Sequence, residues 1–174
     1  MRNLDAGDHG RMAGFQDTYL GRLRAIVGDR LVLMPGARIV VEDADGRILL
    51  QERSDFGLWG LPGGNAEEGE SLSSIIVREV EEEMGLKVRD PQPFGFASDP
   101  AHETITYPNG HRCQFFVMLF FARSFEGEAR VADDESRAFG WFAPDALPAS
   151  TMPNMRRTVE AYAVFRRTGA FQMI

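Results

Sequence analysis

The amino-acid sequence predicts a single α/β (α+β) domain in which helices flank a mixed β-sheet. Three observations carry this prediction. The chain has 174 residues, of which 44% are hydrophobic and 26% charged, enough for one core but short for two typical domains. Segments with the pattern of β-strands alternate with segments of helical spacing. A stretch dense in glycine and proline, residues 57–69, stands directly before one of the expected helices.

The N-terminal part combines a leader, a helix and the first strands. Residues 1–14 are polar and aperiodic, which predicts a flexible leader before a domain that spans residues 15–174. Apolar residues within 15–27 recur at helical spacing, and Gly28 is suited to end that helix. Strands are then expected at residues 31–33, 38–42 and 48–52, the last two joined by a hairpin turn at residues 43–46.

The remaining elements follow the stretch rich in glycine and proline. Ser71 is a suitable N-cap for a helix at residues 72–84, and Gly85 is a suitable terminator. Further strands are expected at residues 94–98, 104–107, 112–122 and 138–142, with a turn at residues 108–110. A last helix is expected at residues 155–168.

Charge, hydropathy and cysteine content restrict the classes of function. The net charge of −7 and the pI near 5.0 argue against a nucleic-acid polymer as partner. The longest uncharged apolar run, residues 115–122, is far shorter than the roughly 20 residues of a membrane helix. The first twenty residues lack the apolar core of a secretory signal, and the single Cys113 excludes an intramolecular disulfide. We therefore expect a cytoplasmic protein with no membrane partner.

Three glutamates on the helix expected at residues 72–84 point to a cation site. Glu79, Glu82 and Glu83 are spaced i, i+3 and i+4, so they share one stripe, at the boundary between core and solvent. Like charges in a row repel one another, and a polyvalent cation would offset the repulsion. Oxygen donors favour Mg²⁺, with Mn²⁺ as the alternative, over zinc or copper. The competing interpretation is a solvated acidic helix face.

These glutamates belong to a longer pattern. Residues 64–86 read GNAEEGESLSSIIVREVEEEMGL and fit G-x5-E-x7-R-E-U-x-E-E-x-G-U at every fixed position, where U is an aliphatic residue. This segment resembles the Nudix box, the signature of the Nudix hydrolase family. The resemblance implies a Nudix-like α/β/α sandwich with a mixed β-sheet and the loop-helix-loop Nudix motif.

The resemblance also implies an activity, the hydrolysis of a nucleoside diphosphate linked to another moiety. Cations neutralise the phosphates and acidify the attacking water, which explains why such chemistry needs an acidic cluster. The alternative is a sensor module that keeps the Nudix fold and binds a nucleotide without cleaving it. Isopentenyl-diphosphate isomerase shares the fold but needs a catalytic cysteine, whereas Cys113 lies in an apolar run typical of a core cysteine.

Single residues take roles through the same resemblance. The positions that match metal ligands are Gly63, through its carbonyl, Glu79, Glu82 and Glu83. Arg78 would orient the acidic cluster through Glu70 or Glu82, and a surface ion pair is the rival interpretation. Arg78, Glu79 and Glu82 are therefore the predicted catalytic residues.

Other residues are candidates with an equally plain alternative. The general base is Glu79 in some family members and a glutamate of a late loop in others; Glu135 lies in a comparable stretch, as a ligand, a base or an acidic loop tip. Arg53 follows an expected strand and could contact a phosphate or simply be an exposed charge. Gly64 would let the backbone approach the metal and the phosphates, or serve only the turn.

The substrate and the oligomeric state stay open. Some family members that cleave ADP-ribose carry a proline in the stretch after the box, where Pro100 lies here. His102 and His111 flank an expected strand and are left outside the site, because lone histidines are more often surface or turn residues. The apolar side of the helix at residues 15–27 fits a homodimer as well as packing within one chain.

Overall fold

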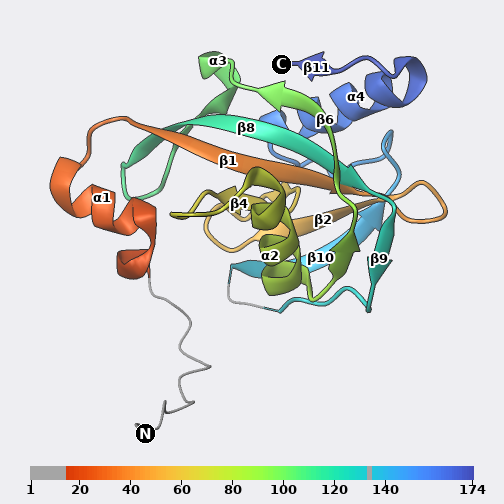
Figure 1. The fold of residues 1–174 in the computed structure, drawn as a ribbon, viewed down its shortest axis with the longest axis horizontal. Helices are drawn as coiled ribbons and strands as arrows, with labels where there is room; N and C mark the ends of the chain where they lie inside the picture. The colour runs from red at the N-terminus through yellow and green to blue at the C-terminus, as the bar shows by residue number, and fades with distance from the viewer. Residues whose placement is uncertain (1–14, 133–134) are drawn as a thin grey trace, which may run out of the picture.

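The computed structural model describes residues 15–132 and 135–174 and arranges them as three β-sheets and four α-helices (Figure 1). The expected leader at residues 1–14 lies outside the described residues. The largest sheet has the strand order β11-β6-β8-β1-β4, and β7 pairs with β8 as well. Its strands are β1 (Val32–Val41), β4 (Gly63–Asn65), β6 (Gln92–Ala97), β7 (Thr104–Thr106), β8 (Arg112–Ala122) and β11 (Gln172–Met173). β1 is parallel to β8 but antiparallel to β4, so the sheet is mixed, as predicted.

Two smaller sheets complete the strands. The first has the order β10-β2-β3, with β2 (Ile48–Arg53), β3 (Trp59–Gly60) and β10 (Ser136–Phe142) all antiparallel. The second pairs β5 (Lys87–Arg89) with β9 (Ser124–Glu126). The predicted hairpin between β1 and β2 is correct only at its turn: Glu42 and Ile48 form one bridge, and the two strands then enter different sheets.

The two strands expected at residues 31–33 and 38–42 are one strand, which corrects the prediction. Pro35 and Gly36 do not break it, because both are paired with β8 on one side. On the other side the Pro35 carbonyl accepts a hydrogen bond from the Ala66 amide at 3.1 Å, and Gly36 lies opposite Asn65 of β4.

Four α-helices flank the sheets in the described residues: α1 (Tyr19–Val27), α2 (Leu72–Met84), α3 (Pro100–Glu103) and α4 (Pro153–Thr168). A 3₁₀ turn, η1 (Phe15–Asp17), precedes α1, because Thr18 is extended and caps α1 through its side chain. Ser71 and Ser74 form a capping box at the start of α2, and Gly85 ends that helix in the left-handed conformation, as predicted. None of these helices is long and apolar enough to span a membrane.

The core is divided between the two faces of the large sheet. Alternate side chains of β1 point to opposite faces, so Ile39 packs against α2, whereas Val40 belongs to the cluster that includes α4. In Figure 1, α4 lies above this sheet and α2 below it. This layering holds α2, the helix with the acidic stripe, against the ends of β1 and β4.

A third, smaller cluster attaches α1 to the rest of the chain. Leu20 packs with Val32, Met34 and Cys113, and Leu23 and Val27 are partly buried beside them. Ile26, in contrast, is 83% exposed. Leu20 of α1 is therefore buried against the sheet of its own chain, and the homodimer stays a prediction.

Candidate active site

Two consecutive glycines of β4 make room for the acidic cluster. A Cβ atom on Gly64 would lie 1.8 Å from Oε1 of Glu79, and a Cβ atom on Gly63 would lie 2.4 Å from the Ala37 carbonyl oxygen of β1. The missing side chain at Gly64 thus makes room for the Glu79 carboxylate, in addition to its expected role of letting the backbone approach a metal and phosphates. The Pro-Gly-Gly sequence lets a carboxylate of α2 rest directly on the strand.

The Glu83 carboxylate is buried and held by neutral donors. Nε2 of Gln51 donates to its Oε1 at 2.8 Å, and the backbone N–H of Gly63 donates to its Oε2 at 3.2 Å. The Ser136 hydroxyl in turn donates to Oε1 of Gln51, which fixes the orientation of that amide. Three separate elements, β2, β4 and β10, therefore position one carboxylate.

Electrostatics at the two inner glutamates favour the protonated form. Burial raises the pKa of Glu83 well above its usual range, and the neighbouring charge of Glu79 adds to the shift, although the hydrogen bond from Gln51 opposes it. Burial also raises the pKa of Glu79 to about 7, against the opposing effect of Arg78. Glu135 raises the pKa of both carboxyls through its charge. A cation at this place would be attracted by all three carboxylates.

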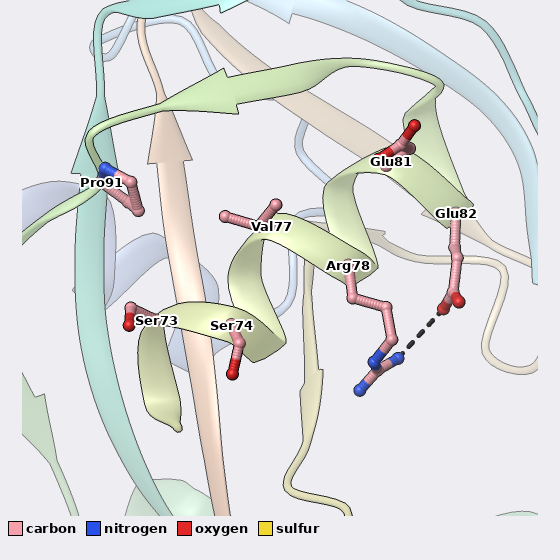
Figure 2. Close-up of a pocket in the computed structure, with 7 residues that line it drawn as sticks. All are labelled: Ser73, Ser74, Val77, Arg78, Glu81, Glu82 and Pro91. Atoms are coloured by element: carbon pink, nitrogen blue, oxygen red, sulfur yellow. Dashed lines mark hydrogen bonds and ion pairs between the residues drawn. The ribbon is translucent and has the colours of Figure 1, made fainter. Parts of the chain in front are cut away.

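Arg78 ties the outer members of the cluster together. Its Nε and Nη2 atoms donate to the two carboxylate oxygens of Glu70 at 2.7 and 3.0 Å, and its Nη1 donates to Glu79 at 2.9 Å and Glu82 at 3.0 Å. Figure 2 shows Arg78 and Glu82 extending from the same side of α2 and meeting there. The sequence offered Glu70 or Glu82 as the partner of Arg78, and the structure shows both. The hydrogen bonds from Arg78 hold the pKa of Glu70 below its usual value.

The three glutamates of α2 differ in burial, which refines the predicted common stripe. The Glu82 side chain is 56% exposed and that of Glu79 16% exposed, whereas Glu83 is buried. The stripe therefore runs from solvent into the core rather than along its boundary. In the described part of the chain, no three acidic, histidine or cysteine side chains already stand together as a metal-binding group; Arg78 draws Glu79 and Glu82 to itself.

The surface depression drawn in Figure 2 lies on the outer side of α2. Its lining residues come from the outer face of α2 and from the residue before β6: Ser73, Ser74, Val77, Arg78, Glu81, Glu82 and Pro91. Neither Glu79 nor Glu83 lines it. This depression therefore faces away from the inner carboxylates.

A second cavity, of about 370 Å³, lies beside the cluster. Arg53 and Glu135 line it, and the charges of both act on Glu83. Arg53 forms a two-pronged ion pair with Asp55 at 2.8 and 3.0 Å. The backbone carbonyl of Glu135 accepts a hydrogen bond from the Ser54 amide at 2.8 Å, which joins the loop before β10 to the end of β2.

The sequence did not predict several of the residues that line this cavity or hold the acidic cluster. His111, set aside there, lines the cavity with Tyr107, Asn65 and Asn109, whereas His102 lies 4.0 Å from Asp99 at the start of α3. Gln51 was also missed, although a polar residue inside the apolar run of β2 was a signal that could have found it. Cys113 is buried, as expected of a core cysteine, and also touches this cavity.

The sequence of the whole domain identifies the family. The model of the NUDIX domain matches residues 32–162. The chain belongs to the Nudix family. A Bacillus subtilis (strain 168) protein provisionally named 8-oxo-dGTP diphosphatase is 30% identical over 127 residues, which are 73% of this chain and 78% of that protein. An ADP-ribose pyrophosphatase of Methanocaldococcus jannaschii is 32% identical over 113 residues, 63% of each chain.

The solved structures agree with this assignment. The crystal structure of the MutT NUDIX hydrolase from Burkholderia pseudomallei shares 32% sequence identity and superposes with a TM-score of 0.63, over 74% of this chain and 97% of that one. The predicted Nudix-like fold is thus confirmed, and the chain is a Nudix hydrolase. Nudix hydrolases generally use divalent metal ions, which fits the oxygen-rich cluster on α2.

Proposed function

We propose that this Nudix hydrolase is a Mg²⁺-dependent pyrophosphohydrolase, with Mn²⁺ as an alternative metal, that acts on a nucleoside diphosphate linked to a further group. The candidates are ADP-ribose, a nucleotide sugar and an ordinary or oxidised nucleoside triphosphate. Water attacks phosphorus, and the products are a nucleoside monophosphate and a phosphorylated remainder or pyrophosphate. The names of two relatives, a diphosphatase and a pyrophosphatase, support this class of substrate.

The observation that carries the proposal is the buried Glu83 carboxylate. It receives hydrogen bonds only from neutral groups among the contacts described above, and burial raises its pKa well above the usual range, against the opposing effects of Gln51 and Arg53. Such a group is costly for a purely structural role and is suited to a cation that arrives with the substrate. The neighbouring cavity offers space for the rest of that substrate.

The metal would be held by the acidic cluster and one backbone carbonyl. The proposed ligands are Gly63, Glu79, Glu82, Glu83 and Glu135. When bound, the ion neutralises phosphate charge and lowers the pKa of a water molecule. Hard oxygen donors of this kind match Mg²⁺ or Mn²⁺ better than a soft metal.

The remaining roles belong to residues that position or contact the substrate. Glu79 would accept the proton of the attacking water. Arg78 orients Glu79 and Glu82, with Glu70 holding its guanidinium from the other side. Arg53 would contact a phosphate, and Gly64 keeps the backbone close to the reacting groups.

The test is a substrate panel with and without divalent metal. The purified protein is incubated with ADP-ribose, nucleotide sugars, dinucleoside polyphosphates and nucleoside triphosphates, and products are separated by chromatography. We expect one preferred substrate, no turnover in EDTA, and a loss of at least about a hundredfold in kcat for Glu83→Gln. Turnover of Glu83→Gln within a factor of two of the wild type would refute the assignment.

Glu81→Gln is the matched control. Glu81 lies on the same helix, but its side chain is half exposed and pairs with Lys87 at 3.5 Å. Its substitution removes the same charge from α2 without touching the inner carboxylates, so turnover should stay within twofold. Nucleotide binding without turnover of any substrate would instead favour the sensor alternative.

We further propose a single domain over residues 15–174, a cytoplasmic location and no nucleic-acid polymer as partner. The packing of α1 on β1 and β8 supports the first of these. The net charge of −7 supports the last. A homodimer is tested by light scattering at micromolar concentration, where the mass of one chain rejects it.

A further inference from the structure

Helix α1 lies outside the part of the chain that matches the Nudix domain, yet it lines the cavity beside the acidic cluster. The match begins at residue 32, whereas η1 precedes α1 and α1 ends at Val27. Phe15, Leu20 and Arg24 of this segment nevertheless form one side of the cavity. Residues of the matched domain, Arg53 and Tyr107 among them, form the other side.

The segment is fastened to the loop that precedes α2. The Glu67 carboxylate accepts the backbone N–H of Tyr19 at 2.9 and 3.0 Å, and so caps the first turn of α1. Arg22 pairs with Glu68 at 2.9 Å. Glu67 and Glu68 occupy positions that the Nudix pattern leaves free, so this chain uses two unconstrained residues of its box to hold α1.

The attachment also reaches the catalytic residues through Glu70. The Glu67 amide donates to Oε2 of Glu70 at 3.0 Å, and the same carboxylate is bound by Arg78. One continuous set of hydrogen bonds therefore connects the start of α1 with the arginine that holds Glu79. The position of α1 is therefore linked through hydrogen bonds to the geometry of the acidic cluster.

At its other end the helix is fixed by a buried arginine. Arg24 is buried and donates to the carbonyl oxygens of Gly28, Arg30 and Arg112, the last at 2.6 Å. It also donates to Sγ of Cys113 at 3.2 Å. These bonds join α1 to the first residues of β8, directly behind the cavity.

Phe15 is held in place although its side chain is half exposed. Its carbonyl oxygen accepts hydrogen bonds from the amide and the hydroxyl of Thr18, at 3.3 and 2.8 Å. It also rests on Gly21, where a Cβ atom would lie 1.8 Å from that oxygen. The missing side chain at Gly21 lets η1 fold back on α1 and keeps the Phe15 ring at the cavity.

The chemistry of the lining suits a nucleobase. Aromatic rings of Phe15 and Tyr107 offer surfaces for stacking, and Phe56 supports Tyr107 at a centroid distance of 5.6 Å. Amide and imidazole groups of Asn65, Asn109 and His111 provide donors and acceptors that can reach the edge of a base. Arg53 and Glu135 are charged residues of the cavity lining. Their charges act on Glu83 of the acidic cluster, and the diphosphate would lie at this side.

We propose that η1 and α1 form the wall of a nucleobase pocket, so that a segment outside the matched Nudix domain binds the base of the substrate. The inference rests on the proposed function, because it takes the ligand to be a nucleoside diphosphate derivative. Phe15 is the residue of this wall that stacks on the base. The pocket binds the base, while the phosphates extend toward α2.

The experiment measures binding of a reaction product, which needs no turnover. Isothermal titration in Mg²⁺ gives the Kd of AMP, GMP and UMP, with ribose 5-phosphate as a ligand that lacks a base. For Phe15→Ala we expect the Kd of the preferred nucleotide to rise about tenfold, the range of a lost contact between a base and an aromatic ring. The Kd of ribose 5-phosphate should change less than twofold, and Phe15→Tyr, which keeps the ring, should restore nucleotide binding.

Ile26→Ala is the control on the same helix. Ile26 points to solvent and does not line the cavity, so both Kd values should stay unchanged. Active enzyme in which Phe15→Ala binds nucleotide as the wild type does would overturn the inference and leave the proposed function intact. Nucleotide binding that depends on Phe15, without hydrolysis of any substrate, would overturn the proposed function instead.

Discussion

Two buried carboxylates of this molecule have opposite surroundings. Glu42, at the end of β1, accepts hydrogen bonds from Tyr162 at 2.6 Å and Arg123 at 2.8 Å, and it pairs with Arg166. Glu83, on α2, accepts hydrogen bonds from two neutral groups of the described residues, the Gln51 amide and the Gly63 N–H. Burial alone would raise the pKa of Glu42, yet its partners lower it, whereas the pKa of Glu83 is raised.

The difference separates a structural group from a functional one. A buried carboxylate that pairs with arginine side chains in the folded chain contributes to stability, because these side chains compensate its charge. A carboxylate that is buried without them opposes folding until an external cation compensates it. In the proposed function a metal ion is that external cation, so Glu83 rather than Glu42 is the carboxylate to test for activity.

The largest expected effect comes from filling the space at Gly64. In Gly64→Ala the new Cβ atom would displace the Glu79 carboxylate, since the two would otherwise be 1.8 Å apart. A displacement of about 1 Å at a catalytic group can lower kcat by about a hundredfold. Steady-state kinetics on the preferred substrate tests this, with circular dichroism to show that the fold is retained; kcat within threefold of the wild type would contradict it.

The next effect is on stability and concerns Glu42. Glu42→Gln leaves Arg123 and Arg166 without their carboxylate, so we expect the free energy of unfolding to fall by about 2 kcal/mol while kcat is unchanged. Urea denaturation measures the change. Glu126→Gln, which breaks the exposed pair with Arg89, is the control and should leave the free energy of unfolding unchanged.

A pH series without metal distinguishes the two kinds of carboxyl, because folding lowers the pKa of Glu42 and raises the pKa of Glu79. The lowered pKa of Glu42 contributes stability above its unfolded value of 4.5, which is lost as the pH falls through the folded value. The raised pKa of Glu79 means that the folded chain holds a proton which the unfolded chain releases, so stability falls as pH rises from 4.5 to about 7.

Thermal unfolding in EDTA should therefore show a Tm that declines by about 5 °C between pH 5 and pH 8 because of the inner glutamates. Glu79→Gln should reduce the decline, and saturating Mg²⁺ at pH 8 should raise the Tm again. A Tm of wild-type protein that responds neither to pH in this window nor to Mg²⁺ would contradict the proposed role of the cluster.

The smallest predicted effect concerns the hydroxyl that orients Gln51. Ser136→Ala removes the donor to Oε1 of Gln51, so the amide is less firmly held against Glu83. We expect kcat/KM to fall about fivefold, which corresponds to about 1 kcal/mol. Ser136→Thr keeps a hydroxyl and should recover most of the activity, which an effect of lost packing alone would not do.

Much of the fold was predictable because local signals agreed with it. The capping residue Ser71, the terminator Gly85 and the apolar face of α2 all gave the same helix. The missed elements are two to four residues long, and β5 and β9, with the sequences KVR and SFE, carry too few apolar residues to show a period. The hairpin was misjudged because a turn signal does not tell which sheet each strand enters.

The sequence could predict residues of the candidate site mainly where they belong to the pattern of the Nudix box. Glu79, Glu82, Glu83 and Arg78 lie within one helix, so spacing alone brings them together. Gln51 and Phe15 reach the same region from distant parts of the chain, and their placement depends on tertiary contacts that no local spacing encodes. The differing burial of the glutamates likewise depends on what packs above α2, not on the helix itself.

The long ladder between β1 and β8 has a consequence for how the protein is made. The paired residues are about 80 positions apart in sequence, from Val32 opposite Cys113 to Val41 opposite Ala122. The entire loop and helix of the Nudix motif lie in the segment between these strands. During synthesis β1 must wait until β8 has left the ribosome, so the large sheet closes late, and the site is complete only after Glu135 and Ser136 have followed.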